Sequence, residues 1–210
     1  MVDVAAAPGR PPEFERDEAL ERAMRVFWQK GYEGTSMTDL TVALGIGRQS
    51  LYGAFGGKRQ LFVECLERYS EHVLQKSLFS MLDAEGSPLA ALKTVLDAWE
   101  AYAGSGEFMG CMLGKSVAEL GRRDSELDAL LRKKLDRIRH GIERNLVRAQ
   151  KAGELTASAD PKVLARSLTA FAQGAAVVCQ VWRDPRAVHD TMLGAHQLIA
   201  AHTSARARPA

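Results

Sequence analysis

Residues 35–58 have the sequence TSMTDLTVALGIGRQSLYGAFGGK, the pattern of two short helices joined by a glycine turn. Thr35 or Ser36 can cap the first helix, and Gly45 supplies a permissive backbone for a sharp reversal. The second helix, residues 47–54, presents hydrogen-bonding side chains suited to base edges and phosphates. These side chains are Arg48, Gln49, Ser50 and Tyr52. The stretch predicts a module that contacts DNA, with an ordinary helical hairpin as the alternative.

The charge of the chain supports a local rather than a global nucleic-acid contact. The 210 residues are 46% hydrophobic and 26% charged, which is typical of a globular protein of one or two domains. The net charge of +2 is too small for a protein that coats nucleic acid through bulk charge. Residues 40–63, however, contain the basic residues Arg48, Lys58 and Arg59 and no acidic residue. We therefore expect DNA to be bound by this patch.

Helical periodicity extends through almost the whole chain, and no strand-type alternation competes with it. The sequence predicts an all-α fold of about nine helices. Residues 13–60 are expected to form the helix-turn-helix domain, and residues 61–204 a second helical domain. The arm at residues 1–12 and the tail at residues 205–210 are rich in Ala, Gly or Pro, which predicts disorder.

Glycines distinguish the second helix of the pair. Gly47 stands where a helix more commonly has a side-chain cap, and Gly53, Gly56 and Gly57 loosen the helix and its exit. A glycine inside a helix costs about 1 kcal/mol relative to alanine. We expect this segment to be mobile in the free protein and to become ordered on DNA.

A late helix is apolar over most of its circumference, which favours contact with a second chain. It begins after Asp160, contains Gly174 and is followed by a further helix after Asp184. An apolar helix rich in small residues suits the close packing of a four-helix dimer interface, although a central helix in a monomer has the same pattern. The predicted interface residues are Leu168, Phe171, Ala175, Val178, Trp182, Met192, Ala195 and Ile199.

A series of short motifs recurs in a fixed order and spacing through residues 16–69. These motifs are Phe27-Trp28, Gly31-Tyr32, Gly34-Thr35-Ser36, Leu44-Gly45-Ile46, Ser50-Leu51-Tyr52, Phe55, Lys58 and Leu61-Phe62. In this order and spacing, residues 16–69 resemble the N-terminal domain of the TetR family of bacterial transcriptional regulators. The remainder resembles that family only in the number and length of its helices, although Gly110-Cys111-Met112-Leu113 is similar to a motif of one recurring subgroup.

The resemblance implies a homodimer that binds a double-stranded operator, represses transcription and is released when a small molecule enters residues 61–204. Arg48 and Gln49 fall on base-contacting positions, where they suit guanine and adenine edges respectively. Phosphate-contacting positions are implied at the start of the first helix of the pair, through the second helix and just after it. These positions are Thr35, Ser36, Ser50, Tyr52 and Lys58.

The second domain offers a set of large apolar side chains for the effector. No cluster of acids or histidines indicates a cationic drug or a metal, so an apolar or aromatic effector is expected. Every candidate also has a simple role in a hydrophobic core. The candidate pocket residues are Trp99, Tyr102, Phe108, Cys111, Met112 and Phe171.

Cys111 supports an alternative function, a repressor that senses oxidants or electrophiles. It begins a short helix, whose dipole lowers the pKa of a thiol, and Lys115 follows one turn later. The competing interpretation is a small buried hydrophobic residue. Cys65, Cys111 and Cys179 are odd in number and far apart, which argues for a reducing compartment and against a disulfide framework or zinc site.

Other functional classes have weaker support. The GxSxG, HExxH and dinucleotide-binding motifs of enzymes are missing, and residues 110–116 resemble a phosphate loop without its first glycine, since Met109 stands there. No cofactor or metal is therefore expected. A helical adaptor that does not bind DNA is disfavoured by the intact Ser50, Tyr52 and Lys58. The start of the chain lacks a signal-peptide pattern, and the longest uncharged segment, residues 167–182, is too short to span a membrane, so we expect a cytoplasmic protein.

Overall fold

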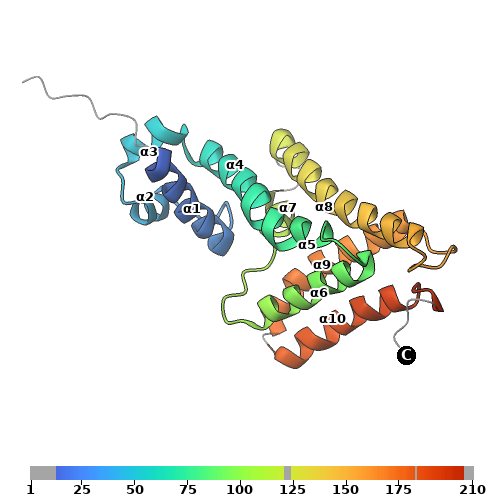
Figure 1. The fold of residues 1–210 in the computed structure, drawn as a ribbon. Coiled ribbons are helices and arrows are strands. Elements are labelled where there is room, and N and C mark those ends of the chain that lie inside the picture. Colours follow the sequence, from blue (N-terminus) through green and yellow to red (C-terminus); the bar gives the residue numbers. More distant parts are fainter. Residues whose placement is uncertain (1–12, 121–123, 183, 206–210) are drawn as a thin grey trace, which may run out of the picture. The chain divides into compact units, whose positions relative to one another are not determined.

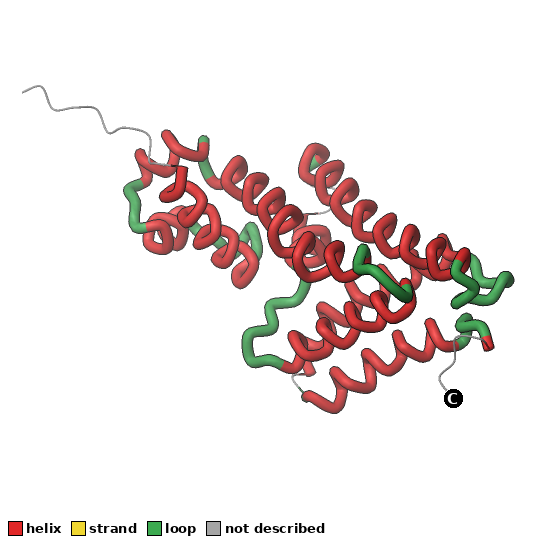
Figure 2. The backbone as a smooth tube through the Cα atoms, viewed as in Figure 1, coloured by secondary structure: helices red, strands yellow, loops and turns green. Residues whose placement is uncertain are grey.

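The computed structural model describes residues 13–120, 124–182 and 184–205, which form an all-helical protein (Figures 1 and 2). The residues predicted to be a disordered arm, 1–12, and most of the predicted tail, 206–210, lie outside this range. Within it, extended pairing is limited to an isolated bridge between Leu155 and Thr203. The nine helices of eight or more residues are α1 (Glu13–Lys30), α2 (Met37–Leu44), α3 (Arg48–Phe55), α4 (Lys58–Arg68), α6 (Pro88–Gly104), α7 (Met112–Leu120), α8 (Ser125–Lys151), α9 (Pro161–Trp182) and α10 (Pro185–Ala200). The predicted fold class is confirmed.

The helix that begins at Lys58 continues beyond α4 in wider turns. Two π-helical segments, η1 (Tyr69–Val73) and η2 (Gln75–Phe79), lead into the single turn α5 (Ser80–Leu82). Segments of this type place one extra residue in a turn, so the side chains beyond them point in shifted directions. The helical run over residues 58–82 is therefore not one regular α-helix.

The chain divides into two compact units, residues 1–69 and residues 70–210. In the first unit α1 packs against both α2 and α4. The aromatic rings of Phe27 and Phe62 meet edge to face with centroids 5.0 Å apart, and Trp28 meets Tyr69 at 4.9 Å. Because α4 carries much of this core, the first compact unit extends to Tyr69, beyond residue 60, where the sequence predicts the end of the helix-turn-helix domain.

In the second unit four long helices contact one another in a ring. Helix α8 packs against α6 and α9, and α10 also packs against both α6 and α9. Two histidine–carboxylate pairs connect α10 to α6, at 2.9 Å between His189 Nδ1 and Glu100 Oε1 and at 3.0 Å between His196 Nε2 and Asp97 Oδ1. The hydrogen bond to Glu100 raises the pKa of His189.

Helix ends follow the capping pattern of the sequence. The hydroxyl of Ser87 accepts a hydrogen bond from the amide of Ala90 at 3.0 Å, and Pro88 occupies the first turn of α6. Asp184 and Pro185 begin α10 in the same way, with the Asp184 carboxylate accepting from the amide of Arg186 at 2.9 Å. These contacts join residues that are neighbours in sequence, which is why the starts of these helices were predictable.

Candidate nucleic-acid interface

Helix α2 begins with a complete capping box. The amide of Asp39 donates to Ser36 Oγ at 3.0 Å, and the amide of Ser36 donates to Asp39 Oδ2 at 2.8 Å. The ammonium group of Lys30 also bonds to Asp39, and together with Ser36 it holds the pKa of Asp39 well below its usual range. Because the folded-state pKa is depressed, this contribution to stability is present at neutral pH and is lost in acid as the carboxylate is protonated.

Gly45 makes the turn between the two helices. Its φ of 70° lies in the left-handed region, where a side chain is strained, and its amide donates to the carbonyl oxygens of Thr41 and Val42. Helix α3 then begins at Arg48. Its N-cap residue, Gly47, has no side chain with which to cap the helix. The helix–turn–helix geometry expected for residues 35–58 is therefore present in the structure.

The two sides of α3 differ sharply in character. Leu51 and Phe55 are 0% and 4% exposed and anchor the helix in the core of the first unit. The polar residues predicted to contact DNA all lie on the open side, and Tyr52 is 56% exposed. These exposed residues are Arg48, Gln49, Ser50 and Tyr52. The fold thus presents the predicted base-contacting and phosphate-contacting side chains together.

Thr35 is a correction to the predicted set. Its side chain is 0% exposed, and its hydroxyl donates to the carbonyl oxygen of Gly31 at 2.5 Å. The hydroxyl therefore closes the end of α1 and is not presented to a phosphate. Ser36, the next residue, is exposed and is the residue that caps α2.

Lys58 lies at the start of α4 and is held by an aromatic ring. Its Nζ is 4.4 Å from the centroid of Tyr32, a cation–π contact. Tyr32 in turn packs on Phe62 at 4.9 Å between centroids. Lys58 is half-buried, which leaves part of the residue accessible and is consistent with the predicted phosphate contact.

Gly57 explains how Tyr52 is oriented. Its φ of 115° is unfavourable for a side chain, and a Cβ atom there would lie 3.1 Å from Cε1 of Tyr52. The Tyr52 ring therefore rests on a bare stretch of backbone between α3 and α4. The sequence suggested only flexibility at this glycine, whereas the structure shows a close contact that requires it.

Thr38 is a polar neighbour that the sequence analysis missed. It is exposed on α2, and its Oγ1 lies 3.5 Å from Nη2 of Arg48. The two residues are ten positions apart and meet only because Gly45 reverses the chain. A threonine in the first turn of the first helix, together with an arginine that begins the second, was the available indication.

Replacing Ser36 by alanine is expected to destabilise the first unit by about 0.5–2 kcal/mol, because the capping hydrogen bonds to Asp39 are lost. Replacing it by glycine is expected to cost only a few tenths of a kcal/mol, or roughly 0.3 kcal/mol. Denaturant unfolding of both variants measures the difference. Equal stability of the alanine variant and the wild-type protein would contradict the capping role.

The amide hydrogens of residues 47–57 are expected to exchange more slowly when operator DNA is bound. Helix α3 lacks a side-chain cap and contains Gly53 on its exposed side, so its free form is held by few local contacts. Hydrogen exchange with and without DNA measures this change, and the buried part of α4 at Leu61–Leu66 serves as the internal control. Equal protection of residues 47–57 in both states would exclude ordering on DNA.

Three of the candidate effector residues form an aromatic cluster in the second unit. Phe108 meets Trp99 at 5.3 Å and Tyr102 at 5.1 Å, both edge to face, beside a buried core that includes Cys179. The hydroxyl of Tyr102 accepts a hydrogen bond from the amide of Met109 at 3.1 Å. Burial raises the pKa of Tyr102. The structure therefore brings these three side chains together, and each is partly exposed.

The other candidate effector residues lie in different surroundings. Met112 is 1% exposed and belongs to the core. Phe171 lies on α9 opposite Gly194 of α10, where a Cβ atom would be 3.5 Å from the ring. Cys111 is half-buried immediately before α7, and burial lowers the pKa of Lys115 one turn later.

Five of the residues predicted for the dimer interface are buried inside the subunit instead. They are each at most 4% exposed because they face the other helices of the second unit. These residues are Leu168, Ala175, Met192, Ala195 and Ile199. Phe171 and Val178 are intermediate, and Trp182 is 54% exposed. The helix was correctly recognised as apolar around most of its circumference, but most of the residues predicted for the interface lie on the side that faces the rest of the subunit.

A second apolar face of α9 is exposed. Val177 and Val181 are 51% and 76% exposed, and Ala170 and Gly174 lie on the same side at helical spacing. On α10 the large residue Leu193 is 43% exposed. Isolated exposed apolar residues are common, but a continuous face of small and branched residues marks a surface for close packing.

The described residues contain neither a candidate metal site nor a helix suited to span a membrane. Among the described residues, no group of three or more His, Cys, Asp or Glu side chains could hold a metal ion. No helix in the described ranges has both the length and the apolar character required to cross a membrane.

Known protein families and individual proteins are similar to this chain in sequence and in fold. Residues 19–65 match the family "Bacterial regulatory proteins, tetR family", and residues 88–195 match "Tetracyclin repressor-like, C-terminal domain". The HTH-type transcriptional regulator YezE of Bacillus subtilis (strain 168) is 32% identical over 87% of this chain and 94% of its own. The HTH-type transcriptional repressor ComR of Escherichia coli (strain K12) is 30% identical over 83% of each chain.

A solved structure extends the similarity to a DNA complex. A cysteine-substituted form of the TetR family transcriptional regulator CifR, bound to 26-base-pair operator DNA, has a TM-score of 0.80 and 29% identity. The alignment covers 92% of this chain and 100% of that one. Both family matches and the relatives aligned along most of their length lead to one conclusion: this chain belongs to the TetR family of bacterial transcriptional regulators.

Proposed function

We propose that this protein is a transcriptional repressor that binds operator DNA through α3 and leaves it when a small effector binds the second unit. The observation that carries the proposal is the outward side of α3, where four polar side chains are exposed on a helix anchored by Leu51 and Phe55. Arg48 and Gln49 contact base edges, and Ser50, Tyr52 and Lys58 contact phosphates. ComR is named a repressor, and CifR is solved on its operator, which supports the same activity here.

The active species is a homodimer, since helix-turn-helix proteins commonly contact paired half-sites with two recognition helices. The exposed face of α9 at Ala170, Gly174, Val177 and Val181 supports this assembly, together with Leu193 of α10. A second copy of this face can cover it, because a two-fold interface uses the same surface on both subunits. Trp182 is retained from the predicted interface because it is exposed.

The effector is an apolar or aromatic small molecule. The cluster of Trp99, Tyr102 and Phe108 supports this class, because its rings are partly exposed and offer edge and face contacts. The phenol of Tyr102 adds a polar group. Such an effector releases DNA only if it binds the DNA-free conformation more tightly than the DNA-bound conformation.

The direct test is binding of purified protein to the DNA beside its own gene. Fluorescence anisotropy is expected to show saturable binding to one fragment from this region and weaker binding to a shuffled fragment of equal length. An effector screen then measures release from the same fragment. Equal affinity for both fragments would overturn the proposed operator recognition.

Introducing charge on α9 through the double substitution Val177→Glu and Val181→Glu is expected to give monomers and to weaken operator binding by about 10-fold or more, since the subunits no longer bind as one unit. Sedimentation velocity measures the assembly, and anisotropy measures the DNA affinity. Val117→Glu on α7 is the matched control, because Val117 is also an exposed apolar residue but lies outside the proposed interface. A dimeric double variant would exclude this face.

A further inference from the structure

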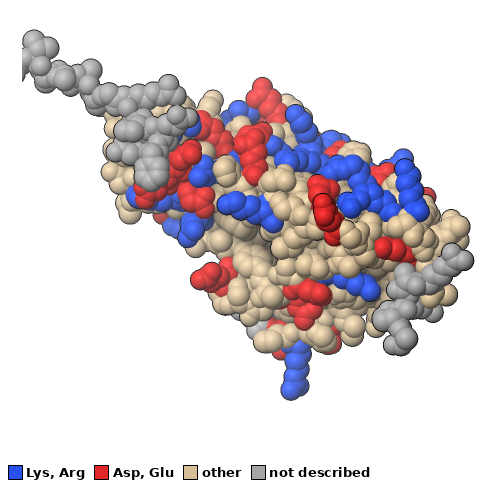
Figure 3. All heavy atoms as spheres, in the orientation of Figure 1, with Lys and Arg blue, Asp and Glu red and all other residues tan. Residues whose placement is uncertain are grey.

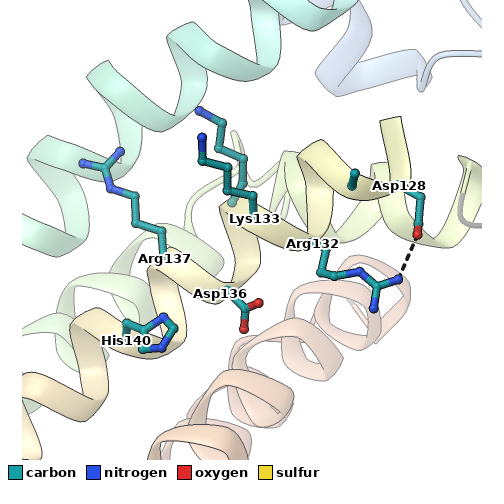
Figure 4. Close-up of a pocket in the computed structure, with 8 residues that line it drawn as sticks. Asp128, Arg132, Lys133, Asp136, Arg137 and His140 are labelled. Carbon is teal, nitrogen blue, oxygen red and sulfur yellow. Dashed lines mark hydrogen bonds and ion pairs between the residues drawn. The ribbon is translucent and has the colours of Figure 1, made fainter. Parts of the chain in front are cut away.

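A cavity of about 800 Å³ lies along α8, outside the aromatic cluster and the DNA-contacting helices (Figure 4). Sites for small molecules typically have volumes of about 300–1,000 Å³. Figure 3 shows Lys and Arg side chains gathered on the surface where Figure 1 places α8. The residues that line the cavity are Asp128, Ala129, Arg132, Lys133, Lys134, Asp136, Arg137 and His140.

The two carboxylates of the cavity are already bound by arginines. Asp128 Oδ2 accepts from Arg132 Nη2 at 2.9 Å, and Asp136 Oδ1 accepts from Arg139 Nε at 3.2 Å. The lining contains four Lys or Arg residues and two Asp residues, which leaves a formal charge of +2 with His140 neutral. The lining therefore favours a ligand with negative charge.

Arg137 is fixed in place by neutral partners. Its Nη2 donates to Oε1 of Gln75 at 3.1 Å, and its guanidinium carbon lies 4.5 Å from the centroid of the Phe79 ring. The Phe79 ring approaches Gly141 so closely that a Cβ atom there would lie 2.7 Å from the ring. These contacts orient the guanidinium without cancelling its charge, so binding an anion costs little side-chain entropy.

Lysines complete the cationic lining. Lys133 is exposed, and Figure 4 shows it extending from the same side of α8 as Arg137, one turn away. Lys134 lines the same cavity and is only 8% exposed. An arginine fork beside a lysine ammonium matches a phosphate group, which has several charged oxygens and accepts charge-assisted hydrogen bonds from both.

We propose that this cavity binds a phosphate-bearing anion with two or more negative charges. Arg137 and Lys133 make the direct contacts, and Lys134 contributes a buried positive charge. The phosphates belong to a free small molecule or to the backbone of nucleic acid, and the two sources are separated by experiment. This site is independent of base contacts by α3 and of the aromatic cluster.

Calorimetric titration with inorganic tripolyphosphate, at constant ionic strength set with sodium chloride, tests the free-anion source. The double variant Lys133→Gln and Arg137→Gln is expected to bind at least about 10-fold more weakly than the wild-type protein, and Lys133→Gln alone at least about 3-fold more weakly, since each loses a charge-assisted contact. Lys151→Gln is the matched control, because Lys151 is exposed on the same helix but lies outside the cavity. Circular dichroism checks that every variant is folded.

Titration with a 20-base-pair duplex that lacks the operator, about two helical turns long, tests the nucleic-acid source. If substitution of Lys133 weakens duplex binding but tripolyphosphate does not bind, the phosphates are those of DNA. If tripolyphosphate binds as expected, the ligand is a free molecule. The proposal would be overturned if tripolyphosphate does not bind saturably and Lys133→Gln leaves duplex binding unchanged, or if Lys151→Gln loses as much affinity as Lys133→Gln. Operator sequence preference is measured separately and is expected to be unchanged, so the two proposals fail independently.

Discussion

Replacing Arg48 by alanine is expected to weaken binding to the operator by about 5- to 150-fold, which corresponds to about 1–3 kcal/mol for a bidentate contact to a guanine. Arg48 is exposed at the first position of α3. The hydrogen-bond partner described for its guanidinium is a neutral hydroxyl, that of Thr38, at 3.5 Å. The affinity for DNA that lacks the operator is expected to fall by a smaller factor than the affinity for the operator. The variant should therefore lose sequence preference as well as affinity.

Anisotropy with operator and shuffled DNA at several salt concentrations measures both effects. Lys58→Ala is expected to weaken both DNAs similarly and to reduce the salt dependence by about one counterion, as expected for a phosphate contact. Arg25→Ala is the matched control, because Arg25 is exposed on α1 and pairs with Glu21 at 3.6 Å. Unchanged sequence preference in Arg48→Ala would remove Arg48 from base recognition.

Replacing Phe62 by alanine is expected to destabilise the first unit by about 3–5 kcal/mol, the usual cost of deleting a buried aromatic ring. Phe62 is 1% exposed and contacts both Phe27 and Tyr32 with centroids 5.0 and 4.9 Å apart. A loss of this size is a large part of the stability of a typical domain. Operator binding should fall with it, because α3 is held by the same core.

Hydrogen exchange of α1 and α4 measures the stability of this unit separately from the second one. Phe62→Leu is the control, since it keeps an apolar side chain in the same place and leaves a smaller cavity. The second unit is expected to retain its protection in both variants. A Phe62→Ala protein with unchanged exchange in α1 would show that the ring contributes little to the folded unit.

Whether a feature can be predicted from the sequence depends on how far apart in the chain the residues that form it lie. Ser36, one of the two predicted caps, and Gly45 were assigned correctly because a cap or a turn is made by residues three or four positions apart. The polar residues of α3 were predicted from the chemistry of their side chains, and the structure shows them exposed. Thr35 was placed wrongly because its hydroxyl bonds back to Gly31, at the end of the preceding helix.

The proposed dimer face shows what helical periodicity leaves open. Helix α9 has apolar residues around most of its circumference, so the pattern alone does not distinguish the face that meets α8 and α10 from the face that remains exposed. The fold buries Leu168 and Ala175 and exposes Val177 and Val181. The choice between faces is made by packing partners that lie many residues away.

The sequence by itself determined the class of fold, the starts of several helices, the polar side of α3 that is predicted to contact DNA and the family of the protein, because these depend on local spacing and short motifs. Only the tertiary structure decided that Thr35 is buried, that Gly57 supports Tyr52, and that Arg137 is oriented by Gln75 and Phe79. Arg137 and Gln75 are 62 positions apart. Their contact depends on the packing of η2 and α8 in the second unit, which no local pattern in the chain specifies.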